Sequence, residues 1–312
     1  MTSKIPDGDF LLIVDVSSYV HRAYHAAPRT VRRADGQPTG AIISLCWTFL
    51  KLFRLNKTAL GRRPSHAVIV MDARGKNFRH EIYPAYKANR PPYDPDLEVQ
   101  LPFIPRVAEA FSIPCVVPVG YEADDLIATY ATRGVAEGLN VVIASADKDF
   151  CQLVSDRVFL YDAMKDRDDD RSRGYDTSHA ILDIDAVVEK WGVFPWQFVD
   201  MQALMGDNVD GIPGVRDIGP KKAAALIKKF DNLDAMLEEA DWGAEQFKPA
   251  EYERIIDSLA EIRISRELAE LKRDVPLELE VDDLYLSPID SRALKAFLES
   301  LEAPQMARRC DF

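Results

Sequence analysis

Phe10-Leu-Leu-Ile-Val-Asp15 is a short apolar run that ends on an aspartate, and two later stretches repeat the pattern. They are His66-Ala-Val-Ile-Val-Met-Asp72 and Asn140-Val-Val-Ile-Ala-Ser-Ala-Asp147. Continuous β-branched runs of this length are typical of strands buried on both faces of a parallel sheet. The three runs therefore predict the centre of an α/β domain in which each strand delivers a carboxylate to one edge of the sheet.

Helical patterns separate these runs and continue beyond them. Between the strands we expect helices over residues 39–55, 97–111 and 122–137. Further along the chain, helices are expected over residues 185–191, 197–204, 219–230 and 252–271. Alternation of strands and helices favours a mostly parallel sheet flanked by helices. The sequence thus predicts an α/β part over residues 1–176 and a helical part over residues 177–312, with a charged run at 166–174 near the boundary.

The chain is acidic, but its charge is unevenly distributed. The 312 residues carry a net charge of −12. Residues 231–290 contain 18 acidic and 6 basic residues, so this segment accounts for the whole excess and the rest of the chain is neutral. Phosphate contacts require Lys and Arg only where the nucleic acid binds. The net charge therefore does not exclude a polyanionic partner.

Cellular setting is indicated by what the sequence lacks. It has no apolar run of the length that a membrane helix needs, and its N-terminus does not resemble a secretion signal. The cysteines are far apart in the sequence and form no CxxC pair, which argues against a disulfide framework or a zinc site. We expect a cytoplasmic protein without a membrane span.

Further acidic residues stand at the ends of predicted elements. Gly120-Tyr-Glu122-Ala-Asp124-Asp125 opens a helix, Asp147-Lys-Asp149 follows the third strand, and Gly206-Asp207-Asn-Val-Asp210-Gly forms a turn. With the strand-end aspartates they make nine candidate metal ligands, namely Asp15, Asp72, Glu122, Asp124, Asp125, Asp147, Asp149, Asp207 and Asp210.

Clustered carboxylates repel one another and must be neutralised by protons, basic side chains or metal ions. Oxygen-rich sites select hard cations such as Mg²⁺ or Mn²⁺, and two such ions can hydrolyse a phosphodiester. Helix capping is the alternative for any single aspartate that follows a strand. Capping alone does not explain why three buried strands all end on aspartate.

The segment after Asp72 is basic and contains aromatic residues. Between residues 73 and 90 only Glu81 opposes five basic side chains, which are Arg74, Lys76, Arg79, Lys87 and Arg90. Phosphates are bound by such charges, and bases stack on the rings that lie among them. Lys87 and Arg90 would point together if this stretch is helical. A solvated basic face is the open alternative.

A glycine-rich turn precedes the helix expected at 219–230. It reads Gly211-Ile-Pro-Gly214-Val-Arg-Asp-Ile-Gly219-Pro-Lys221-Lys222. Glycine turns expose backbone N–H groups to phosphate at a helix N-terminus, and the two lysines stand beside them. Gly214, Gly219, Lys221 and Lys222 are therefore candidate DNA contacts, with an ordinary helix–loop–helix connection as the alternative. The pattern matches neither a P-loop nor a dinucleotide fingerprint.

Five of these motifs occur in a fixed order. They are Val14-Asp15-Val-Ser-Ser-Tyr-Val-His-Arg22-Ala-Tyr24-His, Phe78-Arg79 through Tyr86-Lys87-Ala-Asn-Arg90-Pro-Pro, Glu122-Ala-Asp124-Asp125, Ala146-Asp147-Lys148-Asp149, and Gly206-Asp207 through Asp210 to Ile212-Pro213-Gly214-Val215. In this order they resemble the bacterial and phage 5′ nucleases, which include the 5′→3′ exonuclease domain of DNA polymerase I and are related to flap endonucleases. The resemblance runs from about residue 10 to 230. It implies a PIN-like α/β fold with a helical arch at about 75–110 and a DNA-gripping helix–three-turn–helix module around 206–230.

The resemblance also implies roles for individual residues. Asp15, Asp72, Glu122 and Asp124 would serve a first Mg²⁺ or Mn²⁺ ion. Asp124 would be shared with a second ion held by Asp147, Asp149, Asp207 and Asp210, with Asp125 behind these ligands. Lys87 and Arg90 would contact the scissile phosphate, Tyr86 would stack on a base, and Arg22 would touch DNA. The helix–three-turn–helix module commonly holds a K⁺ ion in this family.

The function implied is metal-dependent cleavage of DNA at 5′ ends, 5′ flaps and junctions by a monomer, in replication or repair. The chain departs from the family at Ala146, where glycine is usual, and at Gly211, where asparagine is usual. Neither change removes a ligand, so we expect an active enzyme. Three alternatives stay open: a catalytically silent junction binder, a PIN-like ribonuclease and, less well supported, a small-molecule phosphatase.

Overall fold

The computed structural model describes residues 5–27, 30–54, 58–166 and 180–308. Six strands form one sheet in the order β3-β2-β1-β4-β5-β6. The central strand β1 (Phe10–Asp15) pairs in parallel with β2 (His66–Val70) and with β4 (Asn140–Ala144). The outer strands are β3 (Cys115–Val116), β5 (Val158–Tyr161) and the antiparallel β6 (Ile181–Leu182). The prediction of a mostly parallel sheet with the three aspartate-ended runs at its centre is confirmed.

Both faces of the sheet are covered because successive side chains of β1 point to opposite sides. Phe10, Leu12 and Val14 join one hydrophobic cluster, whereas Leu11 and Ile13 join the other. The first cluster contains side chains of α1 (Val16–Ala26), α2 (Gly40–Arg54), α5 (Ile104–Ala110), α14 (Ser291–Ser300) and α15 (Pro304–Ala307). The second contains side chains of α6 (Ala123–Ala136), α8 (Ile184–Trp191) and α9 (Phe198–Met205).

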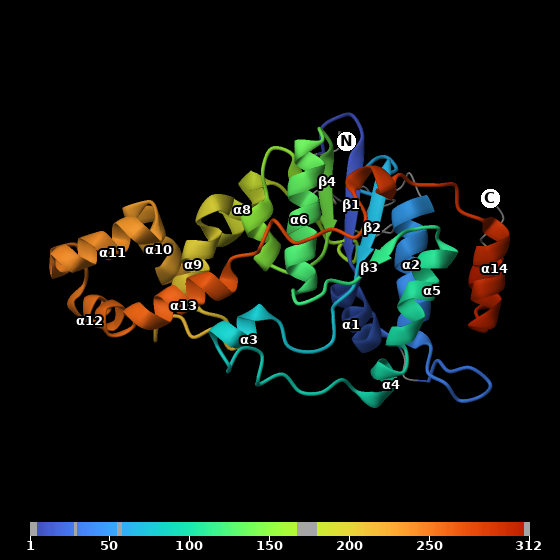
Figure 1. Cartoon of the computed structure of the whole chain (residues 1–312), viewed down its shortest axis with the longest axis horizontal. Helices are drawn as coiled ribbons and strands as arrows, with labels where there is room; N and C mark the ends of the chain where they lie inside the picture. The colour runs from blue at the N-terminus through green and yellow to red at the C-terminus, as the bar shows by residue number, and fades with distance from the viewer. Residues whose placement is uncertain (1–4, 28–29, 55–57, 167–179, 309–312) are drawn as a thin grey trace.

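Four further helices extend the molecule at the α9 side of the sheet (Figure 1). They are α10 (Pro220–Phe230), α11 (Leu233–Trp242), α12 (Pro249–Asp257) and α13 (Leu259–Ala269). The single helix expected over 252–271 is thus two helices that meet at Ser258. Short 3₁₀ turns complete the described chain, namely η2 (Asp149–Leu153), η4 (Pro195–Gln197), η5 (Ala244–Gln246) and η6 (Val281–Leu284).

The segment between β2 and β3, predicted to be a helical arch, crosses the carboxyl side of the sheet with little helix (Figure 1). It contains α3 (Phe78–Ile82) and α4 (Pro95–Glu98), and the helix expected over 97–111 is divided into η1 (Leu101–Phe103) and α5. Pro102 and Pro105 stand at this division, and proline lacks the N–H that a helix interior requires. Lys87 lies in a turn with φ 53°, so the helical geometry expected around it is wrong.

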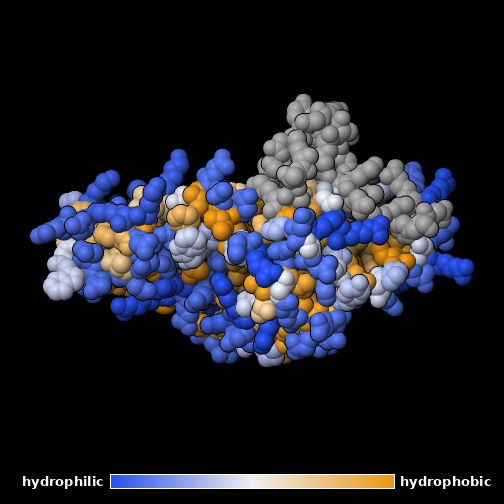
Figure 2. Space-filling view, turned by 90° about the horizontal axis from the view of Figure 1, so that it is seen from above, coloured by the Kyte–Doolittle hydropathy of each residue, from blue (hydrophilic) through white to orange (hydrophobic). Residues whose placement is uncertain are grey.

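Hydrophilic residues dominate the face of the molecule shown in Figure 2, and hydrophobic residues show between them only in patches. Within the described ranges, no helix is long and apolar enough to cross a membrane. The predicted boundary between residues 176 and 177, and the charged run 166–174 apart from Asp166, lie outside the described residues.

Candidate active site

The strand-end aspartates meet at one edge of the sheet, as the sequence predicts. Asp15 is the last residue of β1, and Asp72 and Asp147 follow β2 and β4 within a few residues. All three line a cavity of about 1080 Å³, together with Asp124 from the first turn of α6 and with Asp210. Because β1, β2 and β4 are parallel neighbours, their carboxyl ends lie side by side. Five of the nine predicted metal ligands thus share one cavity.

Asp15 serves both as a helix cap and as a wall of this cavity. One of its carboxylate oxygens accepts a hydrogen bond from the Ser18 N–H (3.1 Å), and the other accepts one from the Ser145 hydroxyl (2.6 Å). Burial raises the pKa of Asp15 to about 7, and the charges of Asp72 and Asp147 add to this rise. The capping explanation is therefore correct for Asp15, but it is not sufficient, because capping does not require a neighbouring cluster of like charge.

Two other carboxyl groups near Asp147, those of Asp124 and Asp149, have raised pKa values. Loss of hydration, followed by repulsion from Asp147, raises the pKa of Asp124 well above its usual value. The same two causes raise the pKa of Asp149 to about 6. Carboxylates that repel in this way gain stability from a hard cation between them. In the described part of the chain, however, no three acidic, histidine or cysteine side chains already stand in a metal-binding arrangement.

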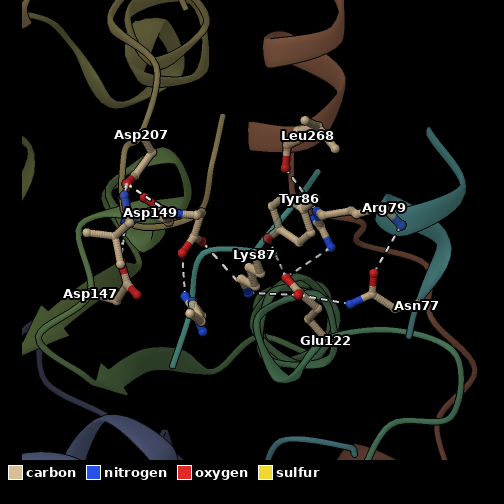
Figure 3. Close-up of polar contacts among 12 residues, drawn as sticks. Asn77, Arg79, Tyr86, Lys87, Glu122, Asp147, Asp149, Asp207 and Leu268 are labelled. Carbon is tan, nitrogen blue, oxygen red and sulfur yellow. Dashed lines mark hydrogen bonds and ion pairs between the residues drawn. The ribbon is translucent and has the colours of Figure 1, made fainter. Parts of the chain in front are cut away.

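Glu122, at the N-terminus of α6, is surrounded by hydrogen-bond donors (Figure 3). It accepts bonds from the Lys87 ammonium (2.7 Å), the Tyr86 hydroxyl (2.9 Å) and the Asn77 amide (2.9 Å). Tyr86 is 3% exposed, because its ring packs in a small hydrophobic cluster with Ile212 and Leu268. The burial of this ring therefore does not support the prediction that Tyr86 stacks on a base.

The remaining predicted ligands are engaged by lysine and arginine. Lys148 forms ion pairs with Asp207 and with Asp149 (3.2 Å). Asp149 also accepts a hydrogen bond from the Gln202 amide at 2.6 Å. Two ammonium groups, those of Lys87 and Lys148, thus lie between pairs of acids that were predicted to bind metal. Asp15, Asp72, Asp124 and Asp147 line the cavity, and within the described ranges none of them forms an ion pair with a lysine or arginine.

Lys87 and Arg90 converge as predicted, although no helix aligns them. Both pair with Asp210, Lys87 at 3.7 Å and Arg90 through a direct hydrogen bond. The Lys87 backbone N–H also donates to the Asp210 carbonyl oxygen at 2.8 Å. These contacts tie the crossing segment, which is the chain between β2 and β3 (residues 71–114), to the turn at 206–214. Both cationic side chains remain on the cavity wall.

Arg79 and Asp125 form a buried ion pair behind the cavity. The guanidinium donates to both carboxylate oxygens of Asp125 at 2.7 and 2.8 Å, and also to the carbonyl oxygens of Leu268 and Glu270. Arg79 is 1% exposed and Asp125 is fully buried. Asp125 further accepts from the Glu122 and Lys272 N–H groups. Asp125 thus lies behind the ligands, the place that the resemblance implies for it, whereas the buried pairing of Arg79 does not support the DNA contact predicted for that residue.

Three other basic side chains predicted to touch DNA, those of Arg22, Arg74 and Lys76, do not line the cavity. Arg22 forms a two-bond pair with Asp162 at 2.9 and 3.3 Å. Arg74 is exposed and lies 3.7 Å from Glu98, and Lys76 is exposed on the same segment. None of the three is among the residues that line the cavity, so any contact with DNA would be made outside it.

The glycine-rich turn folds tightly between α9 and α10. Asp207 and Ile212 exchange backbone hydrogen bonds of 2.9 and 2.8 Å. The Gly214 N–H donates to the Ser265 hydroxyl at 2.9 Å and Gly214 is buried, which does not support the predicted DNA contact at this residue. Gly219 is exposed and caps α10, whose first turn carries the exposed Lys221 and Lys222.

Several cavity residues were not singled out from the sequence. Lys148 bridges two acids, and His21 and Tyr93 contact each other with ring centroids 5.1 Å apart. All three line the cavity. Tyr93 follows Arg90-Pro91-Pro92, so its closeness to a predicted phosphate contact was the available signal. His21 lies on α1 two turns beyond Asp15, a spacing that carries no functional signature by itself.

Comparison with known proteins identifies the family. Residues 10–192 match the family described as "5'-3' exonuclease, N-terminal resolvase-like domain", and residues 193–292 match "5'-3' exonuclease, C-terminal SAM fold". DNA polymerase I of Rhizobium leguminosarum is 40% identical over 308 residues, which cover 98% of this chain but 29% of that protein. The 5'-3' exonuclease of Aquifex aeolicus (strain VF5) is 34% identical over 302 residues, which cover 96% of this chain and 95% of that protein.

Solved structures show the same fold at low identity. T5 5'-exonuclease with bound zinc is 21% identical, with a TM-score of 0.61 over 96% of this chain and 97% of that one. The catalytic core of Rad2 in complex with DNA substrate is 13% identical, with a TM-score of 0.57 over 97% of this chain and 91% of that one. With both family profiles matched in order over the α/β and helical parts, this chain belongs to the 5'-3' exonuclease family of nucleases.

Proposed function

We propose that this chain is a divalent-metal-dependent 5′→3′ exonuclease and structure-specific 5′ flap endonuclease that hydrolyses phosphodiester bonds in DNA. One observation carries the proposal: Asp15, Asp72, Asp124 and Asp147 line the same cavity as Lys87 and Arg90. Carboxylates for a hard cation and cations for a phosphate are the two components that metal-assisted phosphodiester hydrolysis requires. Primer removal in replication and repair is the role in which such cleavage is used.

The donor set fits Mg²⁺ or Mn²⁺. All four aspartates offer oxygen, and no thiolate or imidazole is needed. Burial, with added repulsion from neighbouring aspartates, raises the pKa values of Asp15 and Asp124, and a bound cation would relieve that repulsion. When bound, a pair of such ions supplies activation of a water molecule and stabilisation of the leaving oxygen. Asp149, Asp207, Asp210 and Glu122 would complete the ligands once Lys148 and Lys87 move away from them.

Lys87 and Arg90 would bind the scissile phosphate. Both reach the cavity from the crossing segment, and Arg90 is 48% exposed, so its guanidinium is accessible to a ligand. An arginine fork binds phosphate oxygens through two parallel hydrogen bonds, and the ammonium of Lys87 adds a point charge. Their present pairing with Asp210 keeps them oriented toward the cavity in the absence of substrate.

The helical part would hold the duplex next to the cut. Gly219, Lys221 and Lys222 stand at the exposed N-terminus of α10, where backbone dipoles and ammonium groups favour phosphate. A K⁺ ion at the neighbouring turn belongs to the same proposal. We assign the nuclease domain to residues 1–176 and the duplex grip to residues 177–312, with Asp207 and Asp210 of the second part completing the metal ligands of the first. The likeness to Rad2 and T5 flap endonuclease, both solved with DNA, supports DNA as the partner. We further propose that the protein acts as a monomer in the cytoplasm.

Cleavage of a 5′-labelled DNA flap tests the proposal directly. We expect products near the flap junction with Mg²⁺ and none with a chelator. Asp147→Ala should abolish most activity, and Lys87→Ala should lower kcat by about 10²–10³-fold, as for loss of another charge-stabilising donor. Asp156→Ala, which changes an exposed aspartate in the turn before β5, should cleave normally.

The same experiment separates the alternatives. An RNA flap of the same sequence is measured beside the DNA flap, and faster cleavage of RNA would replace this proposal with a ribonuclease. Tight flap binding without product in Mg²⁺ or Mn²⁺ would leave a junction binder. Equal cleavage by Asp147→Ala and the unchanged protein would remove the carboxylate cluster from the reaction.

A further inference from the structure

The cavity at the sheet edge has an aromatic wall as well as an acidic one. Of the tyrosine and tryptophan residues that line it, Tyr24 is 7% exposed and Trp191 is half-buried, whereas Tyr93 is 43% exposed. Tyr86, the ring that was expected to meet a base, is buried against Ile212 and Leu268. Tyr93 therefore presents the most accessible of these rings to a ligand in the cavity.

The Tyr93 ring is supported from one side by a rigid element. Its centroid lies 5.1 Å from that of His21 with an interplanar angle of 47°. His21 belongs to α1, the helix that Asp15 caps, so its position is coupled to that of the central strand. Asp72 and Arg90 line the same cavity as both rings. Their charges affect the pKa of His21 and that of Tyr93. Burial is the largest cause in both cases, lowering the pKa of His21 and raising that of Tyr93.

The chain between Arg90 and Tyr93 is stiff. Pro91 and Pro92 separate the two residues, and proline fixes φ near −65° while restricting the residue before it. The two side chains therefore reach the cavity at a nearly fixed spacing along the segment. If Arg90 holds a phosphate, Tyr93 is placed to meet the base of an adjoining nucleotide.

We propose that Tyr93, backed by His21, is a stacking platform for the base of a nucleotide that adjoins the scissile phosphate. The inference rests on the proposed nuclease function and adds a specificity element to it. Stacking uses the face that every base has, so Tyr93 distinguishes a nucleotide that carries a base from one that lacks it, without reading sequence. Tyr93 thus takes the role that the sequence resemblance assigned to Tyr86.

A flap substrate with a single abasic nucleotide next to the cut site tests this inference. In the unchanged protein, the missing base should lower kcat/KM by roughly 5- to 150-fold, the worth of one stacked base. Tyr93→Ala should lose a similar factor on the normal flap and lose little more on the abasic one, since the same interaction is then already absent. Tyr93→Phe should behave as the unchanged protein, because stacking needs the ring and not the hydroxyl.

Binding gives a second readout that does not depend on cleavage. With 2-aminopurine in place of the adjoining base and a chelator present, protein binding should quench its fluorescence, and Tyr93→Ala should not. Tyr93→Leu keeps an apolar side chain without a ring and should resemble Tyr93→Ala. Trp242→Ala, which removes an 84% exposed ring on α11 outside the cavity, is the matched control and should leave quenching unchanged.

The outcomes separate this inference from the nuclease proposal. If no flap is cut in any metal, the proposed function fails, while quenching still decides whether Tyr93 stacks on a base. If flaps are cut but the abasic penalty is equally large in Tyr93→Ala, or if Tyr93→Leu matches the unchanged protein in both assays, the stacking role is overturned. Thermal unfolding of each variant verifies that it is folded.

Discussion

At the scale of single residues, the buried pair of Arg79 and Asp125 supports the site from behind. The two side chains are 1% and 0% exposed, and Arg79 also donates to two carbonyl oxygens near the end of α13. The pair thus joins the crossing segment, the N-terminus of α6 and the chain after α13. Loss of one partner leaves the other charge buried without compensation. Its role follows from burial, which the basic pattern around Arg79 does not reveal.

We therefore expect Arg79→Ala to lower the free energy of unfolding by about 3–5 kcal/mol. Urea denaturation measures this loss, with Lys76→Ala as a control on the exposed part of the same segment. The double variant Arg79→Ala/Asp125→Ala should lose less than the sum of the two single variants, because each single change already breaks the pair. Normal stability combined with weaker DNA binding would restore the DNA-contact role first predicted for Arg79.

Asp15 illustrates how one residue satisfies two explanations. Its carboxylate caps α1 through Ser18 and receives the Ser145 hydroxyl, yet it also faces Asp72 and Asp147. A strand-end aspartate that caps the following helix is common, and so the residue alone does not distinguish the two roles. The neighbours do, because they come from β2 and β4, which lie on either side of β1.

At the scale of elements, the turn between α9 and α10 depends on two glycines at positive φ. Gly206 has φ 65° and Gly214 has φ 61°. A Cβ on Gly214 would lie 2.4 Å from the Gly206 nitrogen, and a Cβ on Gly206 would lie 2.7 Å from the Ile212 carbonyl oxygen. Only residues without a side chain allow the two ends of the turn to approach this closely. This turn places Asp207 beside Lys148. It also places Asp210 beside Lys87 and Arg90.

Gly214→Ala should consequently destabilise the protein by at least about 1 kcal/mol and reduce flap cleavage, because the clash is with backbone that cannot move aside freely. Gly219→Ala is the matched control for stability, since Gly219 has negative φ and a Cβ there meets nothing within 4 Å. Thermal unfolding of both variants checks the loss of stability, and the cleavage rate of Gly214→Ala checks the loss of activity. Equal losses of stability at the two positions would contradict this account of the turn.

The crossing segment shows why an element can be located from sequence without its conformation being known. Its position over the carboxyl edge and its basic side chains were expected, but its chain is mainly turns joined by the short helices α3 and α4. Prolines at 84, 91, 92 and 95 interrupt the helical pattern, because each removes a donor and restricts the residue before it. Lys87 is held by its contacts with Glu122 and Asp210 and not by a helix.

At the scale of the whole molecule, charge is divided in a way that is compatible with the proposed binding of DNA by an acidic protein. Residues 231–290 account for the net charge of −12, whereas the cavity wall and the start of α10 carry Lys87, Arg90, Lys221 and Lys222. Each phosphate contact releases counterions, so the salt dependence of binding counts the contacts made. Local basic side chains, and not the net charge, are expected to set this dependence.

Lys221→Ala should weaken duplex binding and reduce the slope of log affinity against log salt by about 1. Titration of a DNA duplex in chelator at several salt concentrations measures the slope. Lys228→Ala, in the last turn of the same helix, removes an equal charge from the opposite end and should leave the slope unchanged. Equal slopes for Lys221→Ala and the unchanged protein would place the duplex elsewhere on the surface.

Local sequence patterns were sufficient to predict the sheet, its central strands and most of the acids that meet at its edge. The runs that end on Asp15, Asp72 and Asp147 are buried β1, β2 and β4 with the residues directly after them, and the helices expected over 39–55 and 122–137 are α2 and α6. These features are local, because a buried strand or an amphipathic helix is written into the periodicity of consecutive side chains. The order of the five motifs likewise indicated the family that the comparisons identify.

Which of the candidate residues are accessible to a ligand became clear only from the folded chain. Arg79, Tyr86 and Gly214 were expected at the DNA, but each is buried against partners more than 30 residues away in sequence: Asp125, Glu122 and Ser265 respectively. Tyr93 and Lys148, in contrast, line the cavity. Burial and pairing depend on which distant segments the fold brings together, and no local spacing in the sequence encodes that arrangement.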